Sequence, residues 1–190
     1  MKILALSCSP RIGGNTDLLL DEFLRGAREY ECSVEKLQVA RLTIRPCVHC
    51  DNCIRTGSCG IKDDMQTIYP NLLKIDALVL AAPIYFMAHC AQAKLLIDRC
   101  QVFWARRYRR SETLRDTAVK PRGIFISVGA THGSKVFAGA QTTMKWLFDA
   151  LDMEYWDNLL FEGLDEKGAV HNHPTALKDA YDLGRTLTQP

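Results

Sequence analysis

The chain has 190 residues, the length of one ordinary domain, and we expect residues 1–190 to fold as a single unit. Its 47% hydrophobic and 24% charged residues exclude a largely disordered chain, and a net charge of +2 gives no reason to expect a nucleic-acid partner. The longest apolar stretch, residues 77–88, is too short to span a bilayer. The sequence opens without a signal-peptide pattern, so we expect a cytoplasmic protein with no membrane partner.

Strand and helix patterns alternate along the chain. Apolar runs predict five strands, at residues 2–7, 34–39, 77–82, 123–127 and 154–161. Apolar residues at the helical period predict five helices, which follow Gly14 and Asp64 and cover residues 93–104, 137–151 and 176–187. Pro70 should kink or shorten the second helix. This alternation predicts an α/β fold with a doubly wound, five-stranded parallel sheet and helices on both faces. Such sheets bind ligands beyond the carboxyl ends of their strands.

The loop after the first strand carries the groups that a phosphate needs. The Gly13-Gly14 pair lets the backbone approach an anion, and the helix that follows presents unpaired N–H groups and a partial positive charge. Further donors are supplied by Ser9, Arg11, Asn15 and Thr16. A polar turn that only caps the helix is the alternative. The dinucleotide and Walker patterns are both absent, which favours the single terminal phosphate of a mononucleotide.

The third predicted strand runs into the segment Pro83-Ile84-Tyr85-Phe86-Met87-Ala88-His89. Pro83 ends the strand because it lacks a backbone N–H. Large apolar side chains at the mouth of a sheet suit stacking on a planar heterocycle, although packing beneath a neighbouring helix is the commoner fate of such residues. The loop after the fourth strand, residues 127–133, is small and glycine-rich and can offer backbone N–H groups.

Four of the eight cysteines lie close together, in the pattern Cys47-x2-Cys50-x2-Cys53-x5-Cys59. Iron–sulfur clusters are held by four cysteine thiolates, and Gly57 lets the chain turn to bring back the fourth. We therefore predict one iron–sulfur cluster on these four residues. Two alternatives stay open. A tetrahedral zinc ion also takes four thiolates, although its ligands usually come as two separated C-x2-4-C pairs, and the thiols can also be free of metal.

A set of residues in chain order carries a family resemblance: Ser9-x-Arg11, Asn15-Thr16, Pro83-x-Tyr85, Lys94, Asp98-Arg99 and Ser127-x-Gly129. This set resembles the NADPH-dependent FMN reductase branch of the flavodoxin-like superfamily over most of the chain. The resemblance implies a flavodoxin-like fold with FMN as cofactor. It places the FMN phosphate at Ser9, Arg11, Asn15 and Thr16, and the ring near Pro83, Ile84, Tyr85, Phe86, Ser127, Gly129 and Gly133. Gly14 stands where the family often has Ser.

The cysteine spacing, the FMN signature and the segment Asp63-Asp64-Met65 together resemble the iron–sulfur flavoproteins. That resemblance implies an oxidoreductase in which a [4Fe–4S] cluster feeds electrons to FMN and on to an acceptor such as oxygen species or quinones. It also implies a homodimer or homotetramer that brings the cluster and the flavin of neighbouring subunits together. The electron donor is expected to be ferredoxin or NAD(P)H. No side chain is predicted to act as acid, base or nucleophile.

Two other functions stay open from the sequence. One is an NAD(P)H-dependent FMN or quinone reductase without a cluster, and the other is a zinc-stabilised flavodoxin-like binding module with no turnover. The basic run Arg106–Arg110 is expected to be a solvated helix end or a subunit contact. His132 lies in the predicted flavin loop and can reach the ring, whereas His49 is expected to be exposed or to donate to a sulfur atom.

Overall fold

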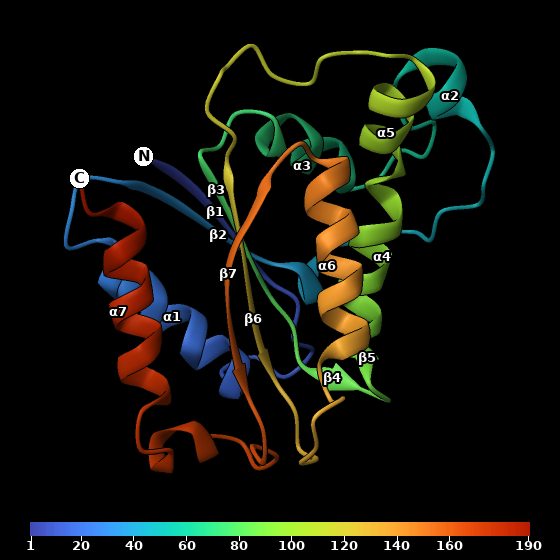
Figure 1. The fold of residues 1–190 in the computed structure, drawn as a ribbon. Coiled ribbons are helices and arrows are strands. Elements are labelled where there is room, and N and C mark those ends of the chain that lie inside the picture. The colour runs from blue at the N-terminus through green and yellow to red at the C-terminus, as the bar shows by residue number, and fades with distance from the viewer.

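A parallel sheet lies at the centre of the computed structural model, which describes residues 1–190 (Figure 1). Its strands are β1 (Lys2–Ser7), β2 (Ser33–Gln38), β3 (Ala77–Ala81), β6 (Arg122–Val128) and β7 (Glu154–Phe161). They run in the order β2-β1-β3-β6-β7, and every neighbouring pair is parallel. This is the strand order of flavodoxin-like doubly wound sheets, so the predicted fold class is confirmed.

Helices cover both faces of the sheet (Figure 1). One face carries α1 (Asn15–Ala27) and α7 (Ala176–Thr188). The other carries α3 (Met65–Leu72), α4 (Ala91–Arg99), α5 (Gln101–Trp104) and α6 (Ala138–Ala150). Neighbouring strand residues point to opposite faces, so Val79 packs in the core beneath α1 and α7 while Leu80 packs in the other core. Burial on both faces explains the continuous apolar runs of the sequence.

Several short elements were not foreseen from the sequence. A five-residue helix α2 (Asn52–Thr56) lies inside the cysteine segment, and a hairpin of β4 (Ile84–Tyr85) and β5 (Ala88–His89) follows β3. A π-helical turn η2 (Ala105–Arg109) continues α5, and two 3-10 turns are η1 (Val39–Arg41) and η3 (Ala169–Asn172). Helix α3 ends at Leu72, two residues after Pro70, as the sequence predicted. None of the helices is long and apolar enough to cross a membrane.

The predicted flavin-binding loops and the cysteine segment lie at opposite ends of the sheet. The loops after β1, β3 and β6 gather at the carboxyl ends of the strands, beside the β4–β5 hairpin (Figure 1). The cysteine segment follows β2 and runs back to the other end, where α2 lies against α5 (Figure 1). Helices α4 and α5 connect the two ends.

Helices α1 and α7 approach closely at two glycines. A Cβ atom built on Gly184 would lie 1.9 Å from the carbonyl oxygen of Phe23, and one built on Gly26 would lie 1.9 Å from that of Tyr181. A helical glycine ordinarily costs about 1 kcal/mol relative to alanine, so Gly→Ala normally stabilises a helix. Here the close approach of the two helices makes Gly→Ala destabilising. We expect Gly184→Ala to lower the free energy of unfolding by about 1–3 kcal/mol, as measured by urea denaturation. An increase would show that the two helices can separate without cost.

Candidate functional site

The loop between β1 and α1 is folded by its own backbone. The Gly14 N–H donates to the Arg11 carbonyl at 2.9 Å, and the Arg11 N–H donates to Ser9 Oγ at 3.2 Å. Gly13 has a φ of +67°, a left-handed conformation that glycine adopts without strain. A Cβ atom on Gly14 would lie 2.8 Å from the Arg11 carbonyl oxygen. The tight turn therefore explains why glycine stands at position 14, where the resembling family often has serine.

The Asp17 side chain fixes the conformation of this loop, a role that the sequence did not indicate. Its buried carboxylate accepts hydrogen bonds from the Gly13 N–H at 2.9 Å and from Ser7 Oγ at 2.8 Å, and it pairs with Lys36 Nζ at 2.9 Å. Burial alone would raise the pKa of Asp17, but the bonds from Lys36, Gly13 and Ser7 outweigh it and hold the pKa below its usual range. The carboxylate is therefore ionised and fixes the conformation of Gly13.

The first turn of α1 leaves a set of donors unused. The backbone N–H groups of Asn15, Thr16 and Asp17 have no acceptor in the chain, and neither does the Thr16 hydroxyl. Unpaired N–H groups at the amino end of a 13-residue helix, together with a hydroxyl, form a binding site for an anion. This donor set fits a phosphate group, as the sequence predicted for this loop.

The Asn15 side chain is engaged elsewhere. Its amide nitrogen donates to the carbonyls of Leu164 at 3.3 Å and Glu166 at 2.8 Å, while its oxygen accepts from the Val170 N–H at 3.2 Å. The amide therefore ties the segment after β7 to α1. Asn15 has only its backbone N–H left to offer to a phosphate.

The segment after β7 also brings a cation that the sequence analysis missed. A Cβ atom built on Gly13 would lie 3.6 Å from Lys167 Nζ, and Lys167 forms no ion pair within the chain. Arg11 reaches the same segment, because its Nη1 donates to the Asp165 carbonyl at 2.9 Å. Two cations thus flank the unused donors. Nothing local in the sequence links Lys167 to Gly13, because the fold brings them together from opposite ends of the chain.

Most, but not all, of the predicted flavin residues meet around one small depression of about 70 Å³. It is lined by Ser9, Arg11, Asn15, Thr16, Pro83, Ile84 and Tyr85, together with Gly14, Val128, Ala130, Leu164 and Asp165. Pockets that enclose a drug-sized ligand measure about 300 Å³ or more. The depression therefore has room for a phosphate-sized group, while a flavin ring would lie over its open rim.

Three of the other predicted flavin residues do not line the depression, and their hydrogen bonds hold the loops that form its rim. Ser127 is buried and donates to the Ala82 carbonyl at 2.6 Å. The N–H of Gly129 donates to the Phe161 carbonyl at 3.0 Å, and the N–H of Gly133 donates to Glu162 Oε2 at 3.0 Å. These N–H groups are already used, so the rim itself is formed by their neighbours Val128 and Ala130. His132 is exposed beside Glu162 and does not line the depression.

The remaining predicted residue, Phe86, stands at the tip of the β4–β5 hairpin. Phe86 and Met87 form a two-residue turn in which both φ angles are positive, 51° and 61°. Hairpin turns of this kind prefer Asn-Gly, because other residues are strained there. Phe86 is also fully exposed, next to a half-exposed Tyr85. Backbone strain of this kind tends to cluster at functional sites, and here it coincides with a fully exposed aromatic ring next to Tyr85, which lines the depression.

We expect the double substitution Phe86→Asn with Met87→Gly to stabilise the ligand-free protein by about 1–2 kcal/mol, because it relieves two strained conformations. The same change should weaken flavin binding, since it removes the exposed ring. Thermal unfolding and flavin titration measure the two effects separately. Met87→Gly alone is the matched control, because it relieves strain while Phe86 remains. A tip that binds nothing would give stabilisation with unchanged flavin affinity.

At the other end of the sheet, all four clustered cysteines line one hollow of about 420 Å³. Cys47 and Cys50 are exposed, whereas Cys53 and Cys59 are half-buried. Burial raises the pKa of the Cys53 thiol, and the neighbouring Cys47 and Cys59 raise it further. Gly57, with a φ of 75°, ends α2 and turns the chain toward the fourth cysteine, as predicted. Apolar walls come from Ile54, Ile61, Val102 and Ala105.

The spacing of these thiols bears on the kind of metal they fit. No three histidine, cysteine or acidic side chains in the chain are close enough together to hold one metal ion. A zinc ion bound at about 2.3 Å would bring its thiolates to within about 4 Å of one another. A four-iron cluster keeps its thiolates farther apart, because each binds a different iron atom. In this structure the four thiols line one hollow but are not drawn together around a single point.

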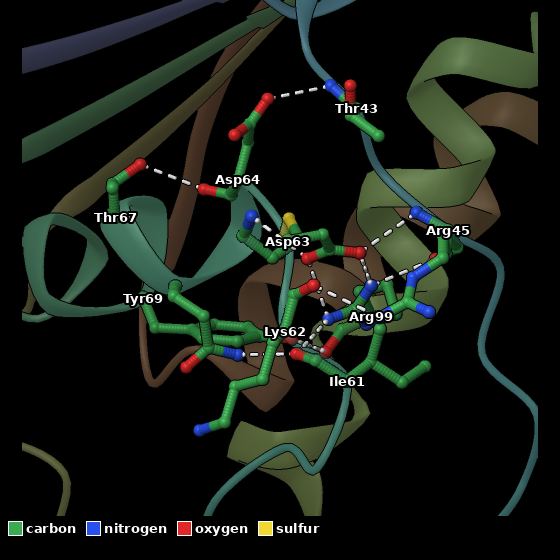
Figure 2. Close-up of polar contacts among 11 residues, drawn as sticks. Thr43, Arg45, Ile61, Lys62, Asp63, Asp64, Thr67, Tyr69 and Arg99 are labelled. Carbon is green, nitrogen blue, oxygen red and sulfur yellow. Dashed lines mark hydrogen bonds and ion pairs between the residues drawn. The ribbon is translucent and has the colours of Figure 1, made fainter.

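A buried ion pair closes the base of the cysteine segment (Figure 2). Arg99 on α4 binds Asp63 through Nη1 at 2.5 Å and Nη2 at 3.1 Å, and both side chains are almost fully buried. Asp63 also accepts from the Arg45 N–H at 2.9 Å, and Asp64 accepts from the Thr43 N–H at 2.7 Å. Residues on the two sides of the cysteine segment are thus joined to each other and to α4.

A second arginine holds the far end of the segment. Arg110 Nη1 donates to the carbonyls of Ile54 at 3.2 Å and Arg55 at 2.8 Å, and its Nε donates to Glu112 at 2.5 Å. Other arginines of the basic run are also paired within the chain, Arg106 with Glu112 and Arg107 with Asp152. Of the arginines in this run, Arg110 is the one that bonds to α2, a contact that its sequence did not suggest. His49 is exposed.

The strand order and the anion cradle after β1 define the class of the protein as a flavodoxin-like, mononucleotide-binding α/β fold. Within that class, the family model described as NADPH-dependent FMN reductase matches residues 1–158, and the chain belongs to that family. Membership places it among the FMN-dependent oxidoreductases.

Curated relatives carry a more specific name. An "iron-sulfur flavoprotein" of Methanocaldococcus jannaschii is 33% identical over 145 residues, which cover 76% of this chain and 68% of the relative. Another, of Methanosarcina thermophila, is 28% identical over 164 residues, which cover 86% of this chain and 82% of the relative. For further relatives with the same name, from Methanocaldococcus jannaschii and Archaeoglobus fulgidus, the match spans about half of the relative's length.

Solved structures share the fold at low sequence identity. The NAD(P)H:quinone oxidoreductase of Methanothermobacter marburgensis matches 100% of this chain and 97% of its own, with a TM-score of 0.75 and 15% identity. The FMN-dependent NADH-azoreductase of Bacillus anthracis matches 100% of both chains, with a TM-score of 0.67 and 13% identity. At such identities the likeness concerns the fold alone.

Proposed function

We propose that this oxidoreductase holds a [4Fe–4S] cluster on Cys47, Cys50, Cys53 and Cys59 and uses it with FMN to pass electrons to an acceptor such as a quinone or an oxygen species. The observation that carries the proposal is the single wide hollow lined by all four cysteines. The names of the relatives support it. When bound, the cluster supplies one-electron transfer and FMN supplies one- and two-electron redox chemistry.

The chain's own groups then bind and orient the cofactors. The free N–H groups of the first turn of α1, the Thr16 hydroxyl, and the cations of Arg11 and Lys167 hold the FMN phosphate. The hairpin tip at Tyr85 and Phe86 lies where the ring leaves the depression.

Two alternatives are weaker for stated reasons. A zinc-stabilised binding module usually takes its thiolates from two separated C-x2-4-C pairs, whereas Cys47, Cys50 and Cys53 follow one another in overlapping steps. In a reductase without a cluster, the cysteine segment that Arg99–Asp63 and Arg110 fix in place would have no function. The family description names an FMN reductase and no cluster, so it agrees with this second alternative as well. The presence of the cluster therefore has to be tested by experiment.

The decisive experiment is the analysis of protein purified without oxygen. We expect about four iron atoms and four acid-labile sulfides per chain, together with one FMN, and a brown colour. Iron without sulfide, or stoichiometric zinc, would overturn the cluster. A yellow protein with FMN but no metal would leave the cluster-free reductase as the function.

The separation of the two sites makes the oligomer part of the proposal. Helices α4 and α5 together cover residues 91–104 and connect the two sites. Their combined length is about 20 Å at 1.5 Å per residue. A second copy of the chain can bring its flavin closer to the cluster than the same chain can. A groove of about 610 Å³ beside the cysteine hollow exposes Trp104, Tyr108 and Trp146 and offers a surface for that copy.

We therefore expect a homodimer or homotetramer whose assembly is weakened by Trp146→Glu, measured by light scattering after size-exclusion chromatography. A wild-type monomer would overturn the assembly. Ferredoxin and NAD(P)H are the proposed donors. Exposure of Cys47 and Cys50 favours a protein donor, because it leaves one side of the cysteine hollow open to an incoming partner.

A further inference from the structure

One hydrogen-bond donor of the buried Arg99 has no partner. An arginine has five N–H donors in a fixed planar arrangement. Four are used: Nη1 donates to Asp63 and to the Arg45 carbonyl at 2.9 Å, and Nη2 donates to Asp63 and to the Ile61 carbonyl at 3.4 Å (Figure 2). The fifth, Nε–H, is buried and bonded to nothing.

The residue that carries this donor borders the cysteine hollow. The Arg99 side chain is fully shielded from solvent, and Arg99 lines the same hollow as the four cysteines. Burial lowers the pKa of Arg99, but its bond to Asp63 outweighs burial and raises it, so the guanidinium is charged. Cys59 is one of the cysteines that border this hollow together with Arg99.

A buried N–H without an acceptor is unfavourable, and native proteins rarely keep one. Water cannot serve it while the side chain is closed off from solvent. The sulfur of Cys59 belongs to the chain and borders the same hollow, so it can serve this donor without access from solvent. The same arginine could not be replaced by lysine at no loss, because a lysine bound to Asp63 has no second nitrogen to present.

We propose that the Arg99 Nε–H donates a hydrogen bond to the Cys59 thiolate when that thiolate binds the cluster, and so makes the cluster easier to reduce. The inference rests on the cluster of the proposed function. Hydrogen bonds to its sulfur atoms are among the factors that set the reduction potential of an iron–sulfur cluster, because they stabilise the more negative, reduced form. Arg99 is thus a positioning residue that also tunes the cluster through one donor.

Arg99→Lys tests the proposal, and Arg110→Lys is the matched control. Arg110 also holds the cysteine segment, but its Nε–H is already bonded to Glu112. Midpoint potentials are measured by anaerobic redox titration followed by electron paramagnetic resonance. We expect Arg99→Lys to keep its iron and sulfide while its reduction equilibrium shifts about tenfold toward the oxidised form, which is about 59 mV for one electron. Arg110→Lys should keep the wild-type potential.

A second measurement detects the hydrogen bond directly. Wild-type protein labelled with 15N at arginine Nε should show a 15N hyperfine coupling to the reduced cluster in pulsed electron paramagnetic resonance, and Arg99→Lys should lose it. An unchanged potential in an iron-replete Arg99→Lys protein, or no coupling in the wild type, would overturn the hydrogen bond and leave Arg99 as a clamp. Wild-type protein without iron and sulfide would overturn the cluster itself, so the two failures are distinguishable.

Discussion

Cys53→Ala is expected to remove the iron and sulfide of the protein completely while FMN stays bound. Cys53 lies deeper in the hollow than Cys47 and Cys50, and its loss leaves three thiolates where a [4Fe–4S] cluster needs four. FMN is retained because its cradle lies at the opposite end of the sheet (Figure 1). Iron and sulfide assays, absorbance of the cluster and released FMN are the measurements. Reduction of FMN by a ferredoxin-type donor should slow in parallel.

The control for this experiment has to be a cysteine outside the cluster whose removal spares the core. Cys8, Cys90 and Cys100 are buried in the core, so replacing them creates cavities. Cys32 is half-buried near the end of α1, far from the hollow in sequence, and is the better choice. Cys32→Ala should keep full iron and FMN. Iron that survives in Cys53→Ala would mean that the ligand set is wrong.

The sequence predicted the sheet well because buried parallel strands leave a strong pattern. Residues 77–81 are apolar without interruption, and the structure buries every one of them. The predicted strand at 34–39 differs by one residue from β2 (Ser33–Gln38), whose half-exposed side chains give a weaker pattern at the sheet edge. Five alternations of strand and helix then left one fold class, and the observed strand order agrees with it.

The parts of the candidate site that sequence reasoning missed depend on contacts between distant segments. Lys167 reaches Gly13 and Arg99 reaches Asp63 only after the sheet has formed. The Asn15 amide was expected to face a phosphate but is held by the segment after β7, which no local pattern indicates. The Phe86-Met87 turn was hidden for another reason. Its residues are unlike those that such turns prefer, so turn chemistry gave no signal.

The largest effect at the flavin site concerns the phosphate itself. Riboflavin has the ring and side chain of FMN but lacks the phosphate, so it can use neither the free N–H groups of α1 nor the two flanking cations. Each charge-assisted hydrogen bond that is lost weakens binding by about tenfold to a hundredfold. We therefore expect the wild-type protein, freed of its flavin, to bind riboflavin at least a hundred times more weakly than FMN, as measured by quenching of flavin fluorescence.

Substitutions in the phosphate-binding loop should reduce the difference in affinity between FMN and riboflavin, and should leave the binding of the flavin ring unchanged. Arg11→Ala and Thr16→Val each remove a phosphate partner and are expected to weaken FMN binding about tenfold to a hundredfold, with riboflavin affinity unchanged. Lys167→Met removes an exposed cation that no hydrogen bond within the chain holds in place, so its effect should be roughly twofold to fivefold and should fade at high salt. Lys178→Met on α7, away from the cradle, serves as the control for loss of a surface lysine. If Arg11→Ala and Thr16→Val weakened FMN and riboflavin equally, the phosphate would lie elsewhere and the donors of α1 would have only a structural role.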